Sequence, residues 1–126
     1  MSYLHFHTYF VGDDQVWVHN TCEIDYVVDQ SGQVFPVPAG ATGPVPVVNQ
    51  SGRQTGVAFT GGSGGANGQV STMRIMDPTA ARGGSPGYPN GYIKYDNVNG
   101  QGVNPYSGRT VPNSESHYPL CTGGGC

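Results

Sequence analysis

Glycine and proline recur along the whole chain, and their positions constrain the fold more than any other feature of the sequence. The 126 residues include 21 glycines and 10 prolines, which gather between short runs rich in valine and tyrosine. Both residue types favour turns and interrupt helices, and no window shows a sustained helical period of apolar residues. The sequence therefore predicts a mainly β fold, with α+β as the alternative, built as a small twisted antiparallel sheet with long Gly/Pro-rich loops and few short helices.

The apolar runs bounded by turn residues are the predicted strands of this sheet. They cover residues 23–28, 34–37, 45–48, 55–59, 69–76 and 92–96. The first four runs form two hairpins around Gln-Ser-Gly turns, which are too short and too common to indicate a repeat. A run of Gly, Ser, Asn and Ala over residues 61–68 is expected to form a mobile loop between the two halves of the chain.

Charge and cysteine content narrow the classes of function. The formal net charge of −3 and the pI of about 5.6 give no general attraction to polyanions, so a nucleic acid would have to be held locally. No apolar stretch approaches the length of a membrane span and the N-terminus lacks a signal-peptide pattern, so no membrane association is expected. Cys121 and Cys126 can close a short loop, but the spacer between them is equally typical of a flexible tail, and no Cys-x-x-Cys zinc or redox pair is present.

The N-terminal segment carries a specific resemblance. The stretch HTYFVGDDQVWVHNTC, residues 7–22, resembles the final hairpin of the Hint (intein-like) pretoxin domain that precedes toxins in Rhs and filamentous haemagglutinin-like secreted proteins. In that family a terminal His-Asn pair, matched here by His19 and Asn20, releases whatever follows it. The remainder of a Hint domain, with its nucleophilic cysteine, is missing, so no autoprocessing is expected and the pair serves as a marker of the junction. The resemblance implies that residues 1–20 are a Hint remnant and that residues 21–126 are a toxin domain.

Strand alternation sorts the rear half into two faces. If Met73, Ile75, Ile93 and Tyr95 face the core, then Arg74 and Lys94 emerge together on the open face. These are two of only five cationic side chains in the chain.

Cleavage of RNA without metal needs a group that takes the 2′-hydroxyl proton, a second that protonates the leaving oxygen, and cations that offset the charge of the phosphorane. We predict that His117, the only histidine outside the Hint remnant, acts with Lys94 and Arg74 as the catalytic group, with neither metal nor cofactor. The predicted substrate-binding residues are Arg109, Thr110, Tyr92, Ser116 and Tyr118, and Tyr88, Tyr106 or Tyr118 can stack on a base.

The three predicted catalytic residues also have ordinary structural interpretations. His117 can be a surface histidine in a loop, and Lys94 can be a solvated strand residue that protects an edge. Arg74 can form an ion pair with Asp77 or with Asp96.

A second resemblance bears on the reaction. The stretch from MRIMDPT to SHYPL, residues 73–120, is similar to C-terminal toxins of the broad ribonuclease group that includes barnase, EndoU-like, colicin-type and RelE-like enzymes. It implies a secreted or delivered toxin that acts as a monomer in the target-cell cytoplasm, cleaves RNA through a 2′,3′-cyclic phosphate and is held in check by a cognate immunity protein. The group usually has helices ahead of its sheet and a basic pI, and this chain departs from both. A DNase, an ADP-ribosyltransferase or a non-enzymatic β-rich binding module are the alternatives.

Overall fold

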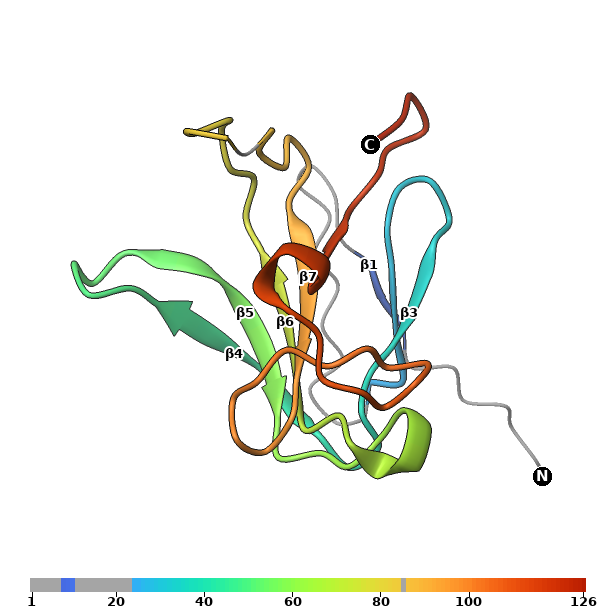
Figure 1. The fold of residues 1–126 in the computed structure, drawn as a ribbon. Helices are drawn as coiled ribbons and strands as arrows, with labels where there is room; N and C mark the ends of the chain where they lie inside the picture. The colour runs from blue at the N-terminus through green and yellow to red at the C-terminus, as the bar shows by residue number, and fades with distance from the viewer. Residues whose placement is uncertain (1–7, 11–23, 85) are drawn as a thin grey trace.

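The computed structural model describes residues 8–10, 24–84 and 86–126, and these are mainly β (Figure 1). The strands of the described residues are β1 (Thr8–Phe10), β2 (Tyr26–Val28), β3 (Val34–Pro36), β4 (Thr42–Val48), β5 (Gln54–Thr60), β6 (Thr72–Met76), β7 (Tyr92–Asp96) and β8 (His117–Pro119). The helical elements within these same residues are the single 3-10 turns η1 (Ala66–Gly68) and η2 (Asn113–Glu115). The predicted β class with few short helices is confirmed.

The strands form two sheets where the sequence predicts one. β4 to β8 make a five-stranded antiparallel sheet in chain order, and β1, β2 and β3 make a three-stranded sheet in which β1 runs parallel to β2. Most of the predicted Hint hairpin, including His19 and Asn20, lies outside the described residues. The β4–β5 hairpin projects away from the remaining strands (Figure 1).

The core lies between the two sheets. Its buried members are Ile24, Val27, Phe35, Val37, Ala41, Phe59, Val70, Met73, Ile75, Ile93, Tyr95, Val103 and Leu120. This set contains the four side chains that strand alternation assigned to the core, so the predicted facing of β6 and β7 is confirmed. The Tyr95 hydroxyl donates a hydrogen bond of 2.7 Å to the Pro36 carbonyl, which joins the two sheets through a polar contact inside an apolar layer.

Three turns share one hydrogen-bond pattern, at Asp29, Asn49 and Asn97. In each turn the side-chain Oδ1 accepts from the backbone N–H groups two and four residues later, and the backbone N–H of a glycine three residues later donates to the carbonyl of the first residue. The three glycines have φ between 80° and 90°, a conformation that costs other residues energy. Two of these turns are the predicted Gln-Ser-Gly turns, and the third joins β7 to the segment that leads to η2.

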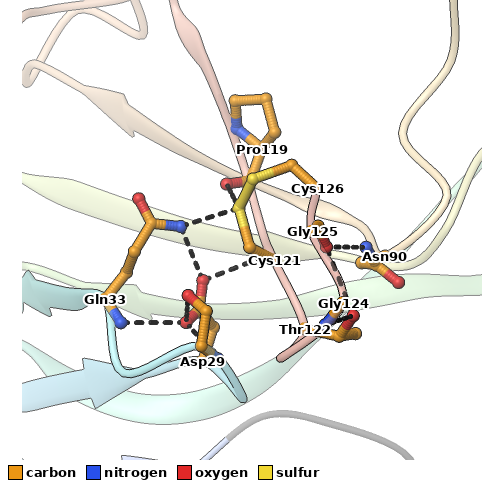
Figure 2. Close-up of a disulfide and its surroundings, with 10 residues drawn as sticks. Asp29, Gln33, Asn90, Pro119, Cys121, Thr122, Gly124, Gly125 and Cys126 are labelled. Carbon is orange, nitrogen blue, oxygen red and sulfur yellow. Dashed lines mark hydrogen bonds between the residues drawn. A yellow bond between two sulfur atoms is a disulfide. The ribbon is translucent and has the colours of Figure 1, made fainter.

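Asp29 does more than shape its turn. Its second oxygen, Oδ2, accepts from the Gln33 side chain at 2.7 Å and from the Cys121 backbone N–H at 2.9 Å. Cys121 forms a disulfide with Cys126, and its sulfur also accepts a hydrogen bond from Gln33 (Figure 2). The C-terminal segment is thereby fastened to the β2–β3 turn, which lies beside it in Figure 1.

The glycine-rich run 61–68 is packed against its neighbours, although the sequence predicts a mobile loop. Ser63 donates its backbone N–H to Ala39, Gly64 and Val70 exchange two backbone hydrogen bonds, and Ala66 donates to Pro105. Because these partners come from both halves of the chain, the run connects the two halves.

Candidate functional site

Arg74, Lys94 and His117 form a row across three neighbouring strands, hereafter the cation row. Arg74 on β6 pairs with Lys94 on β7, and Lys94 pairs with His117 on β8. Adjacent strands lie about 4.8 Å apart, so the row spans roughly 10 Å. All three side chains leave the sheet on the face opposite the core, because the residues that flank Arg74 and Lys94 along their strands are buried. The sequence places His117 in a loop; the structure places it on a strand, at the edge of the sheet.

A buried carboxylate holds the two cations. Asp96 lies on the same face of β7 as Lys94 and is only 1% exposed. Lys94 Nζ donates a hydrogen bond to Asp96 Oδ1, and Arg74 Nε lies 3.2 Å from Oδ2. The Arg74 contact is an ion pair that lacks hydrogen-bond geometry, since Oδ2 has no hydrogen-bond partner among the described residues. Asp96 is therefore the partner of Arg74, while Asp77 is exposed.

The charge left over in the row belongs mainly to Arg74. Its side chain is 42% exposed and that of Lys94 is 15% exposed. One carboxylate faces two cations, so the cluster keeps a positive charge, and the more accessible part of it is the Arg74 guanidinium. A guanidinium fixed at its Nε still has outward N–H groups that suit the oxygens of a phosphate.

The contacts of His117 determine which ring nitrogen is available. His117 Nδ1 lies 2.9 Å from the Asn113 carbonyl oxygen, and because a carbonyl only accepts, we assign the proton to Nδ1. Nε2 then carries the free lone pair of the neutral ring. Ser116, which is fully buried, donates its hydroxyl to the same carbonyl at 3.0 Å and lies 3.3 Å from Nδ1. Ser116 therefore supports the turn that holds the imidazole and does not face solvent as a substrate-binding residue would.

Three rings form an aromatic cluster beside the cation row. The Tyr88 ring stacks on His117 with centroids 5.6 Å apart and planes 12° apart. The Tyr92 ring lies 4.5 Å from His117 and 4.7 Å from Tyr88, tilted by 50° to both. Burial raises the pKa of Tyr92 and the neighbouring Tyr88 adds to this, while the Arg74 charge acts in the opposite direction. The Tyr92 hydroxyl is therefore protonated at neutral pH and lies within electrostatic reach of Arg74.

The remaining predicted residues are not brought to the row. Arg109 and Thr110 are exposed in the loop before η2, where the backbone of Arg109 bonds Asn104 and Thr110 pairs with Val103. Tyr118 lies opposite Ile93, so it points toward the core. There its ring meets Tyr95 edge-on, its hydroxyl is buried with no hydrogen-bond partner among the residues that the structure describes, and burial raises its pKa.

Sequence reasoning named Asp96 only as one of two possible partners of Arg74, and it did not assign Asn113. Alternation also places Asp96 beside Lys94, since a residue two positions away on a strand shares its face. Asn113 acts through its backbone carbonyl, and a backbone contact leaves no signal in residue type.

Within the described ranges, no group of three or more His, Cys, Asp or Glu side chains is arranged to hold a metal ion. The same ranges contain no helix of the length and apolarity that a membrane crossing requires. Comparison with protein-family models, with curated proteins and with solved structures gives no match to this chain.

Proposed function

We propose that this chain is an endoribonuclease that works without a metal ion and acts as the effector domain of a delivered bacterial toxin. The observation that carries the proposal is the alignment of Arg74, Lys94 and His117 across adjacent strands on the open face of the sheet. Two cations beside an imidazole can bind a phosphodiester and move a proton at the same place.

In the proposed reaction His117 Nε2 takes the proton of the ribose 2′-hydroxyl. The O2′ atom then forms a bond to phosphorus while the bond from phosphorus to O5′ breaks, and Arg74 and Lys94 offset the negative charge that collects on the phosphate oxygens. The leaving O5′ takes a proton from the Tyr92 hydroxyl or the Lys94 ammonium. The products are a 2′,3′-cyclic phosphate and a 5′-hydroxyl.

The toxin part of the proposal rests on the resemblance of residues 7–22 to the end of a Hint domain and of residues 73–120 to ribonuclease toxins. It includes delivery by the producing cell, action in the cytoplasm of the target cell, and a cognate immunity protein that covers the cation row. A monomer is sufficient, because all the residues of the row come from one chain.

The direct test is incubation of the purified protein with total bacterial RNA in EDTA, followed by analysis of the product ends. We expect cleavage with 2′,3′-cyclic termini, and we expect His117→Ala to lower the rate by about 100-fold or more, the usual contribution of general acid–base catalysis. Arg53→Gln is the matched control, because Arg53 is an exposed cation in the β4–β5 turn, away from the row, and should leave the rate unchanged.

Other results would redirect the assignment. Intact RNA after incubation with the wild type and with His117→Ala would exclude ribonuclease activity. Cleavage of DNA with added metal, or transfer of label from NAD, would then identify another effector reaction. Cleavage by His117→Ala at the wild-type rate would show that His117 is not a catalytic residue.

A further inference from the structure

The aromatic cluster of Tyr88, Tyr92 and His117 lies on the wrong face of the sheet to be part of the core. Tyr92 shares the open face of β7 with Lys94, and His117 is the end of the cation row. None of the three belongs to the buried core, and all three are partly exposed. The strands of a sheet usually present polar side chains on the face turned to solvent, so three rings gathered there call for a purpose other than packing.

The spacing between these rings and the cations matches the parts of a nucleotide. Tyr92 is two residues from Lys94 on β7, which separates their Cα atoms by about 7 Å along the strand. Arg74 lies opposite Lys94 and therefore diagonally across from Tyr92 on the same face of the sheet, so cation, phenol and imidazole border one small region. A phosphate held by Arg74 and Lys94 therefore has, one ribose away, aromatic ring surface on which its base can stack.

We propose that Tyr88, Tyr92 and His117 form a subsite for an unpaired nucleobase beside the scissile phosphate, so that the substrate class is single-stranded RNA. This inference rests on the proposed function, because it takes the cation row as the phosphate site. A duplex keeps its bases stacked and paired, which hides the ring faces that this cluster would contact. Stacking tolerates all four bases, since every base has a π-face, so the subsite selects strandedness more than sequence.

Binding can be measured apart from cleavage with 2′-O-methyl oligonucleotides, which lack the attacking hydroxyl. Fluorescence anisotropy would compare a labelled single strand, the same strand annealed to its complement, and the same strand with one abasic position moved along it. We expect the single strand to bind at least about 10-fold more tightly than the duplex, and one abasic position to weaken binding by about 5-fold to 100-fold, the range for loss of one stacked base.

Variants identify the rings involved. Tyr88→Leu should weaken single-strand binding by the same factor and Tyr88→Phe should not, because phenylalanine keeps the ring. The contacts of Tyr88 with Thr79 are backbone hydrogen bonds, so either substitution leaves them in place. Tyr26→Leu is the matched control, since Tyr26 lies on the outer face of β2 in the other sheet and is 39% exposed.

The outcomes separate the two proposals. Equal affinity for single strand and duplex, or no abasic position that weakens binding to the wild-type protein, would overturn the subsite whether or not RNA is cleaved. If the protein binds single strands tightly in a way that depends on Tyr88 but leaves natural RNA intact, the subsite is supported and the proposed ribonuclease activity is excluded.

Discussion

At the scale of single residues, one atom separates Asp29 from Asn49 and Asn97. The three residues begin turns with the same hydrogen-bond pattern, but Asp29 has an oxygen, Oδ2, where the asparagines have an amide nitrogen. That oxygen accepts hydrogen bonds from Cys121 and Gln33. Asp29→Asn would turn a donor toward the Cys121 N–H. We expect the free energy of unfolding to fall by about 1–3 kcal/mol, the usual penalty for a buried polar group left without its partner.

Urea denaturation measures this difference, and Asn49→Asp provides the reciprocal control. The Asn49 turn is exposed, so that change should stay within about 0.5 kcal/mol. Equal stability of Asp29→Asn and the wild type would mean that the hydrogen bond from Cys121 to Asp29 does not hold the C-terminal segment in solution.

The same residue predicts a dependence of stability on pH. Burial acts to raise the pKa of Asp29, but hydrogen bonds from Ser31, Cys121 and Gln33 outweigh it, so the pKa lies below its ordinary value of 3.8. Because the unfolded chain then binds the proton first, the contribution of Asp29 to stability is complete above the unfolded pKa and is lost as the pH falls through the folded pKa. Urea midpoints of the wild type and Asp29→Asn should differ by a constant amount at neutral pH and converge in acid. A gap that persists at pH 2 would contradict this.

Asp96 carries a prediction about the stability of the cation row. Asp96→Asn leaves the Lys94 ammonium, whose side chain is only 15% exposed, without its carboxylate. We expect the free energy of unfolding to fall by about 3 kcal/mol, as when one partner of a buried ion pair is removed. Asp77→Asn, at an exposed carboxylate in the loop after β6, should cost less than about 0.5 kcal/mol. A similar small loss for Asp96→Asn in urea titrations would indicate that water solvates the row.

At the scale of elements, the turns that begin at Asp29, Asn49 and Asn97 need glycine only for its backbone conformation. Gly52 has φ of +85° and an added Cβ would meet no atom within 4 Å, so Gly52→Ala should lose about 1–2 kcal/mol from the left-handed conformation. Gly52→Asn should lose less, because asparagine tolerates that region. Gly123→Ala, where the added Cβ also meets nothing, should be neutral. Thermal unfolding would show the order; an unchanged Tm for Gly52→Ala would exclude the left-handed turn.

The elements also show where sequence reasoning succeeds. The strand of residues 92–96 and the facing of Met73 and Ile93 follow from alternation and are confirmed, because a sheet with one buried face imposes a period of two residues. β8 was missed because three residues ending at Pro119 are too short to show any period. Its pairing with β7 is set by the chain that returns through η2. Because of that pairing, His117 lies on a strand at the end of the cation row and not in a loop.

Residues whose role depends on contacts distant in sequence could not be placed in advance. Tyr118 resembles Tyr92 as a residue type, yet β8 points it at Tyr95 in the core. The second sheet was missed for a related reason: β1 joins β2 by a parallel pairing, which no hairpin signal announces.

At the scale of the whole molecule, the two sheets share one core and should unfold together. Val27 on β2 is fully buried in the core that also contains Met73 and Ile93 of the other sheet. Val27→Ala should therefore lower the global free energy of unfolding by about 2 kcal/mol. It should also speed the hydrogen exchange of the Ile93 amide, in the opposite sheet, by about 30-fold. Val34→Ala, on the adjacent strand β3 but 52% exposed, should change neither quantity. If Val27→Ala left exchange at Ile93 unaffected, the three-stranded sheet would open by itself, and the site on the open face of β6, β7 and β8 would not depend on it.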